Sequence, residues 1–320
     1  MKLGMMLPVK PDIQWKLAAQ LGVDAVITKA APELSGLPDP SDYDALKAVR
    51  DRFADAGLTL YALEGDEFDM TRIKLGLPGR DRDLDRYRRM LHNMGKLGIR
   101  LLCYNFMAGV GWFRSKHELE ERGGALTSGF DLDDLDDRQP LRVTEEEMWA
   151  NYAAFLRAVL PAAEEAGVRM GLHPDDPPVS PLLGYSRIFT SAEAFRRAMS
   201  LSDSPSHGIT FCQATFRVMG EKVFDLIPEF GSRLFFLHFR DAVGTREHFR
   251  ETFHDNGPTD MAALLRLAGK YAPDCLIRPD HTPTMAGESN EKLGYTVQGN
   301  LFAVGYIRGI LDTLKEGNAK

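Results

Sequence analysis

The stretch "DCLIRPDHTPTMAGE", residues 274–288, decides how the rest of the chain is interpreted. Its apolar run Cys275, Leu276 and Ile277 is typical of a strand buried in a parallel sheet. Asp280 and His281 follow at the point where such a strand emerges. In a (β/α) barrel the carboxyl ends of the strands form the catalytic face. The stretch therefore predicts a barrel strand that carries an acid and an imidazole to that face.

Short β-rich runs alternate with longer helical patterns along the whole chain. We expect strands at residues 2–7, 23–28, 58–64, 99–106, 168–173, 207–212, 233–239 and 275–280. We expect helices at 12–22, 41–57, 81–97, 144–167, 191–200, 221–230, 259–271 and 297–315. Ser41 is a candidate N-cap of the second helix, and Thr144 and Glu147 form a capping-box pattern for the fourth. Eight such units in one domain, residues 1–320, favour a closed α/β fold, the (β/α)8 TIM barrel, over an open doubly wound sheet.

Residues 107–143 form an insertion after the fourth strand that is too long for an ordinary loop between a strand and a helix. We expect it to cover the barrel mouth as a lid, to contact a second subunit or to be disordered. Its acidic run "DLDDLDD", residues 131–137, lacks the glycine and glutamate spacing of a calcium loop, so a solvated loop is favoured there.

Composition limits the class of protein. The 320 residues are 44% hydrophobic and 27% charged, and the formal net charge is −7 with both signs interspersed. This leaves no basic face for nucleic acid and no polybasic patch for a membrane, so the expected partner is a small molecule. Three scattered cysteines are too few for a disulfide framework and indicate a reducing compartment. Since no segment is apolar for long enough to be a signal-peptide core or a membrane span, we expect a cytoplasmic protein.

Four successive predicted strands end in a residue that can bind a metal ion. These residues are His173, Cys212, His238 and Asp280. Imidazole, thiolate and carboxylate together favour a divalent transition metal, such as Mn²⁺, Fe²⁺, Co²⁺ or Zn²⁺, over calcium and magnesium, which prefer oxygen ligands. A lone buried cysteine is more often a core residue, as we expect for Cys103 and Cys275. Four metal-compatible residues on one rim of the barrel nevertheless predict a single metal site.

Other polar residues follow the same strands. His281 and Tyr295 are candidates to donate or accept a proton beside a bound substrate. Arg240 and His254 lie in the loop after the seventh predicted strand and are candidates for substrate binding. The guanidinium group of Arg240 can form two parallel hydrogen bonds with a substrate carboxylate. The alternative for Arg240 is an ion pair with Asp241 at the barrel mouth.

Several long motifs resemble the D-mannonate dehydratase family of the xylose-isomerase-like TIM barrels. They are "LHPDDPP" (172–178), "FCQATF" (211–216), "LHFRD" (237–241), "FHDNGPTDM" (253–261) and "RPDHTPTM" (278–285). The likeness covers roughly residues 60–315. The chain departs from the family pattern at its start, where "GMMLPVKPDIQW" (4–15) stands in place of an "RWYGP"-like segment, and at Ala214, where a glycine is common.

The resemblance implies dehydration of D-mannonate to 2-keto-3-deoxy-D-gluconate in hexuronate catabolism. It also implies Mn²⁺ or Fe²⁺ as the cofactor and a homo-oligomer, dimeric or larger. The family's metal ligands correspond to His173, Cys212, His238 and Asp280, and its acid and base residues correspond to His281 and Tyr295. The sequence leaves open which of the last two is the base.

Three alternatives to this function remain open from the sequence. A metal-dependent sugar or sugar-acid isomerase or epimerase can use the same barrel and the same metal-binding rim. A diverged dehydratase could act on a different polyol acid. A non-catalytic protein that binds a sugar acid is the alternative from another class. The mass of the product separates a dehydratase from an isomerase, because only the dehydratase releases water.

Overall fold

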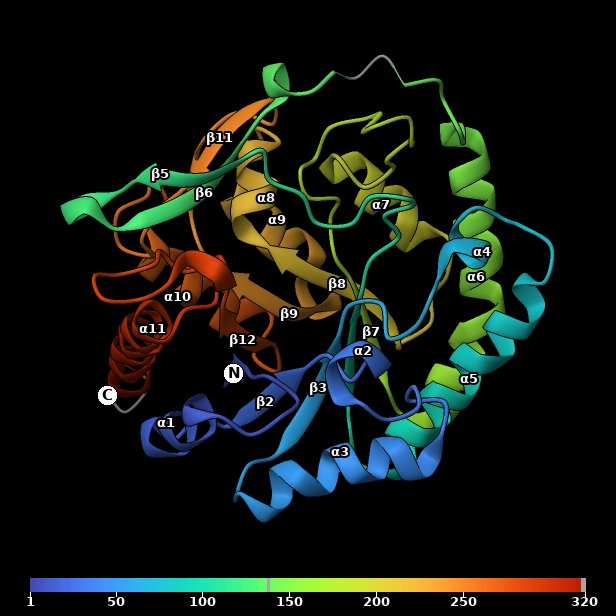
Figure 1. Ribbon diagram of the computed structural model, residues 1–320, viewed down its shortest axis with the longest axis horizontal. Helices are drawn as coiled ribbons and strands as arrows, with labels where there is room; N and C mark the ends of the chain where they lie inside the picture. The colour runs from blue at the N-terminus through green and yellow to red at the C-terminus, as the bar shows by residue number, and fades with distance from the viewer. Residues whose placement is uncertain (137–138, 318–320) are drawn as a thin grey trace.

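The computed structural model describes residues 1–136 and 139–317, and its central feature is a closed barrel of parallel strands (Figure 1). The strand order around the barrel is β1-β12-β9-β8-β7-β4-β3-β2. The barrel strands are β1 (Lys2–Met6), β2 (Ala25–Thr28), β3 (Leu60–Glu64), β4 (Leu101–Tyr104), β7 (Arg169–Leu172), β8 (His207–Cys212), β9 (Leu234–Phe239) and β12 (Leu276–Pro279). Each lies within a predicted run, so the prediction of an eight-stranded TIM barrel is confirmed.

Helices surround the barrel on its outer side (Figure 1). The long ones are α1 (Ile13–Leu21), α3 (Tyr43–Asp55), α5 (Arg80–Lys96), α6 (Glu145–Ala166), α7 (Ala192–Ser200), α9 (Val223–Phe230), α10 (Met261–Tyr271) and α11 (Val297–Gly317). All are close to the predicted ranges. The short helices α2 (Pro32–Ser35), α4 (Thr71–Lys74) and α8 (Gln213–Val218) complete the set. They escape prediction because one turn or two shows no periodic pattern.

The helix starts test the predicted caps. Thr144 and Glu147 form the predicted capping box at the start of α6, with each side chain bonded to the other residue's backbone N–H. Helix α3 begins differently, because its N-cap is Asp42 and not Ser41. The Asp42 carboxylate accepts a hydrogen bond from the backbone N–H of Ala45 at 2.9 Å.

The insertion folds into part of a second, antiparallel sheet at the carboxyl-end rim of the barrel (Figure 1). Its strands β5 (Lys116–Glu120) and β6 (Leu126–Asp131) pair with each other. Strand β6 also pairs with β11 (His248–Glu251), which pairs with β10 (Ala242–Gly244) in the loop after β9. Disorder is therefore the wrong expectation for these strands. The acidic run continues from β6 into a 3-10 turn at Leu132–Asp134, and residues 137 and 138 lie outside the described residues.

Candidate active site

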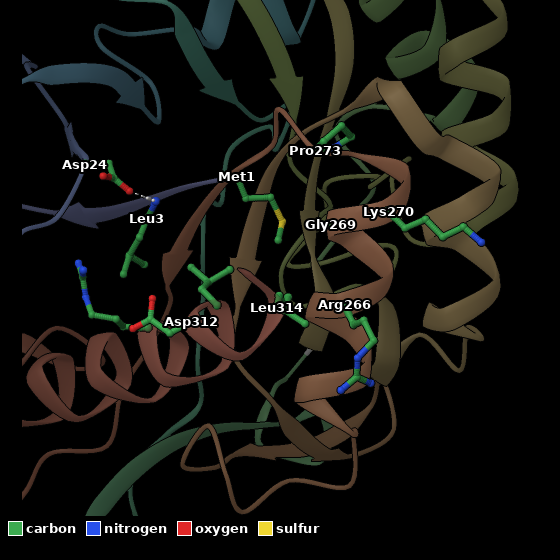
Figure 2. A pocket seen from close by; sticks show the side chains of 11 residues that line it. Met1, Leu3, Asp24, Arg266, Gly269, Lys270, Pro273, Asp312 and Leu314 are labelled. Atoms are coloured by element: carbon green, nitrogen blue, oxygen red, sulfur yellow. Dashed lines mark hydrogen bonds between the residues drawn. The ribbon is translucent and has the colours of Figure 1, made fainter. Parts of the chain in front are cut away.

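Two cavities lie at opposite ends of the barrel. The larger, about 550 Å³, is at the amino ends of the strands, where Met1, Leu3, Asp24 and Pro273 contribute to its wall (Figure 2). The other, about 300 Å³, opens at the carboxyl ends. Because TIM-barrel enzymes carry their catalytic groups at the carboxyl ends of the strands, the second cavity is the candidate active site. Its wall includes Glu64, Cys103, Trp112, His173, Asp176, His238, Arg278, Asp280, His281 and Tyr295.

The four predicted metal ligands converge in space. One ligand atom each from His173, Cys212 and His238 lies within 4.8 Å of the other two. These residues belong to the neighbouring strands β7, β8 and β9 or follow them directly. Asp280, which follows β12, is close to two of them, because its Oδ2 lies 3.7 Å from His238 Nδ1 and 3.8 Å from Cys212 Sγ.

The donor atoms of this cluster fit a divalent metal ion. Nδ1 of His173 lies 2.7 Å from the carbonyl oxygen of Pro174, so it carries the proton and Nε2 keeps a free lone pair. Burial lowers the pKa of His173 and favours that neutral form. Neither buried ring nitrogen of His238 makes a hydrogen bond of good geometry within the described residues, although Nε2 lies 3.4 Å from Glu64 Oε2. Such groups need an explanation, and a bound ion is one.

Asp280 is held as a carboxylate. Burial raises its pKa, but the positive charges of Arg278 and Arg240 oppose this effect, and the pKa lies well below its usual range. Its Oδ1 accepts hydrogen bonds from Arg278 at 2.8 Å and from the Tyr295 hydroxyl at 3.2 Å. The oxygen Oδ2, which faces Cys212 and His238, accepts one from Arg240 at 2.8 Å. An acceptor lone pair beside the cluster is therefore available to an ion.

A second trio of possible ligands overlaps the first at His238. It consists of Glu64, Cys103 and His238, again within 4.8 Å of one another. Cys103 is buried in the core as expected, yet it also lines the cavity. Burial raises the pKa of its thiol well above the usual value, which disfavours the thiolate that binds metals. Glu64 is already bound to Arg278 by two hydrogen bonds of 2.5 and 3.0 Å. The predicted quartet is thus the better ligand set.

His281 and Tyr295 reach the cavity from the segment after β12. Nδ1 of His281 lies 2.8 Å from Glu251 Oε1, and since a carboxylate only accepts, Nδ1 is the donor. The other nitrogen, Nε2, lies 3.6 Å from Asp280 Oδ1. Burial raises the pKa of Tyr295 well above its usual value, so the phenol keeps its proton. The ring centroids of His281 and Tyr295 are 5.4 Å apart, which places a carboxylate-oriented imidazole beside a protonated phenol.

Arg240 and His254 are not part of the cavity wall. The Arg240 guanidinium is almost completely buried and donates to Asp280, Glu251 and Asp176 at 2.8, 3.0 and 2.7 Å. Its donors face protein carboxylates, so the structure does not bring the predicted substrate-binding group to the cavity. The predicted alternative, an ion pair between Arg240 and Asp241, does not form either, because Asp241 accepts hydrogen bonds from Gln213 and Thr259. His254 is fully buried, and its ring centroid lies 6.2 Å from that of Phe239.

Several residues of the site were missed by sequence reasoning. Glu64 is the last residue of β3, and Arg278 is the next-to-last residue of β12. Both therefore lie at the carboxyl end of a strand, as the predicted metal ligands do. Asp176 accepts two hydrogen bonds from Arg114 of the insertion, at 2.6 and 2.9 Å. Trp112 packs against His281 with ring centroids 4.9 Å apart. The insertion, one expected role of which was a lid, brings Trp112 into the cavity wall and places Arg114 behind it, on Asp176 and Glu251. The sequence does not indicate which residues of the insertion take these positions.

The closed barrel of eight parallel strands, with a histidine, cysteine and aspartate cluster at the carboxyl ends of the strands, has the architecture of a TIM-barrel enzyme. The fold resembles a xylose isomerase domain protein from Planctomyces limnophilus, with a TM-score of 0.61 at 14% identity over 98% of each chain. It also resembles D-psicose 3-epimerase from Clostridium cellulolyticum H10, with a TM-score of 0.61 at 15% identity over 99% of each chain. At such low identity these likenesses show the fold alone.

Within this class the chain belongs to the D-mannonate dehydratase family. The family model described as D-mannonate dehydratase (UxuA) matches residues 13–146 and 141–320. The mannonate dehydratase of Oceanobacillus iheyensis is 31% identical over 84% of this chain and 85% of that protein. That of Enterococcus faecalis is 31% identical over 92% of each. The solved mannonate dehydratase from Streptococcus suis serotype 2 has a TM-score of 0.91 at 29% identity, and the match covers 100% of this chain and 95% of that one. The resemblance found in the motifs is confirmed, and the protein is a hydro-lyase.

Proposed function

We propose that the protein removes water from D-mannonate to give 2-keto-3-deoxy-D-gluconate. The observation that carries this proposal is the cavity in which His281, oriented by Glu251, and the protonated Tyr295 stand beside Asp280 and the histidine–cysteine cluster. A dehydration next to a carboxylate needs one group that accepts a proton and one that donates a proton. The family to which the chain belongs supplies the reaction class.

The proposed metal ligands are His173, Cys212, His238 and Asp280. We favour Mn²⁺ or Fe²⁺ on the family resemblance, with Zn²⁺ and Co²⁺ as alternatives that the ligand types also allow. When bound, such an ion supplies positive charge that makes the proton beside the substrate carboxylate easier to remove. A Cys212→Ser variant should lose most of its bound metal by elemental analysis. Cys275→Ser, in which the replaced thiol lies at the other end of the barrel, is the control and should keep its metal.

The proton transfers are assigned to the chain's own residues. Because Nδ1 of His281 donates to Glu251, its Nε2 carries a lone pair and acts as the base that takes the proton from C2. Tyr295 holds its proton and delivers it to the hydroxyl that leaves C3. The hydroxyl departs with that proton as water. The resulting enol loses the proton of its C2 hydroxyl and takes up a proton at C3, which gives the ketone of the product. The proton taken by His281 and the one given by Tyr295 balance, so both residues return to their starting states.

Solvent exchange in D2O separates the two roles. His281→Asn should lower kcat by about two to four orders of magnitude and stop deuterium from entering C2. Tyr295→Phe should lower kcat to a similar extent but still allow exchange at C2. His92→Gln, on the outer helix α5, is the matched control. If both active-site variants turned over at the wild-type rate with metal bound, the assignment would be wrong. A product with the mass of the substrate would instead indicate an isomerase or epimerase.

Assembly and location stay predictions. No helix in the described part of the chain is long and apolar enough to cross a membrane. We propose a homo-oligomer of two or more subunits in the cytoplasm, supported by the family resemblance and by the scattered cysteines. Light scattering coupled to size-exclusion chromatography measures the oligomeric state, and a single chain in solution would contradict the first part.

A further inference from the structure

A second space, which we name the first-strand lobe, adjoins the candidate active site. Its volume is about 300 Å³. The lobe shares Met6, Lys29 and Tyr295 with the wall of the active-site cavity. Its other wall residues are Leu7, Pro8, Val9, Lys10, Gln14, Thr28, Leu34 and Lys292. A molecule that fills the active-site cavity can therefore extend past these three shared residues into the lobe.

The first-strand lobe and the active-site cavity differ in charge. Among the described residues, the lobe is lined by the lysines Lys10, Lys29 and Lys292 and by no aspartate or glutamate. The active-site cavity contains the acids Glu64, Asp176 and Asp280. The rest of the wall is largely apolar, and Glu33, the acid that pairs with Lys29, is not part of it. A low-dielectric wall weakens the screening of the lysine charges, so these lysines attract anions. The lobe therefore favours a negatively charged group.

Lys29 stands at the junction of the two spaces, directly after β2. Its Nζ lies 3.4 Å from the carboxylate of Glu33, and the two side chains are 32% and 63% exposed. An exposed pair of this kind contributes little and is readily exchanged for another anion. Arg278, by contrast, is buried and held by both Glu64 and Asp280. Lys29 is thus the cation of the cavity wall that can turn toward a ligand.

We propose that Lys29 determines substrate specificity by binding a second anionic group, at the end of the substrate remote from its reacting carboxylate. The substrate class is a six-carbon sugar acid that carries a phosphate or a second carboxylate at C6. D-mannonate, with a neutral hydroxyl at C6, is turned over without this contact. The inference rests on the proposed function: if the reacting end of the substrate lies beside His281 and the metal-ligand cluster, the opposite end of a six-carbon chain can reach the lobe past Lys29.

The test compares binding and turnover of D-mannonate, its 6-phosphate and D-mannarate by the Mn²⁺-loaded protein. Calorimetry should show that the wild type binds at least one dianion about ten to one hundred times more tightly than D-mannonate, as expected for one charge-assisted contact. Lys29→Met should remove this preference, so that KM for the dianion rises to the value that the same variant shows for D-mannonate. Lys29→Arg should restore the preference. Lys16→Met, an exposed lysine on α1, is the matched control.

The outcomes separate this inference from the proposed function. Turnover of D-mannonate with equal affinity for all three acids upholds the function and overturns the role of Lys29. An undiminished preference for a dianion in Lys29→Met does the same. Failure of the wild type to bind or dehydrate any of the three acids contradicts the proposed function and removes the inference with it. The stronger-binding dianion identifies the group as phosphate or carboxylate.

Discussion

Replacing Arg114 by methionine tests what fastens the insertion to the barrel. The Arg114 side chain is completely buried and donates to Asp176 at 2.6 Å and to Glu251 at 2.6 Å. Methionine keeps much of the stem but removes the charge, so two buried carboxylates each lose a cationic partner. Breaking a buried pair costs about 3–5 kcal/mol. We expect about 3 kcal/mol, the lower end of that range, because Arg240 still donates to both acids.

Arg122→Met is the matched control from the same insertion. Arg122 also makes two hydrogen bonds to one acid, Asp255, both at 3.0 Å, but its side chain is 47% exposed. Such a pair contributes at most about 1 kcal/mol. The entropy of unfolding of a chain this long is about 0.7 kcal/mol/K, so Arg114→Met should lower Tm by about 4–5 °C and Arg122→Met by less than about 2 °C. Calorimetric scans at neutral pH measure both shifts, and equal shifts would refute the argument that burial makes the Arg114 contacts important.

Two further predictions concern stability away from the site. Burial lowers the pKa of His207 below the ordinary value of 6.5 that applies in the unfolded chain. As the pH falls below 6.5, the imidazole is therefore protonated in the unfolded chain before it is protonated in the folded chain. The free energy of unfolding should therefore fall as the pH decreases from about 7 to 5, and His207→Gln should make that fall shallower in denaturant titrations; an identical slope contradicts this. Gly257→Ala places a Cβ in steric conflict with the Asp241 carboxylate and should cost about 1–3 kcal/mol. Gly305→Ala in α11 has nothing within 4 Å of its Cβ and should gain up to about 1 kcal/mol. Chemical denaturation measures both, and a loss of the same size in each would count against the packing argument.

The barrel could be predicted because each of its strands carries its own signal. Runs such as "LFFL", residues 234–237, are continuously apolar, as is typical of strands buried on both faces. The antiparallel sheet at the rim could not be predicted in this way. Its strands β6 and β11 pair Phe130 with Phe249 across more than a hundred residues, and neither strand is long or apolar enough to stand out alone. The choice between Ser41 and Asp42 as a cap is equally invisible, since both types cap helices well.

Part of the candidate site could be predicted from the sequence and part of it could not. The convergence of His173, Cys212, His238 and Asp280 follows from strand order, because parallel strands end at one rim. The orientation of the Arg240 side chain does not follow from the strand order. It lies at the same rim, but its guanidinium turns to Asp176 and Glu251, which arrive from a loop and from the rim sheet. Only the tertiary structure brings those acids together. A position at the rim therefore predicts the part of the barrel in which a side chain lies but not the groups to which it hydrogen-bonds.

The charges around the cluster explain why a divalent ion suits it. The acids Glu64, Asp176, Glu251 and Asp280 are largely buried and outnumber the buried guanidinium groups that pair with them, those of Arg114, Arg240 and Arg278. Burial keeps His173 neutral, so it adds no positive charge. The arginines therefore stabilise most of the carboxylate charge but leave an excess next to Cys212 and His238. A divalent ion neutralises the excess carboxylate charge and also accepts the imidazole lone pairs. A buried site with both features therefore favours a cation over a water molecule or a protonated acid.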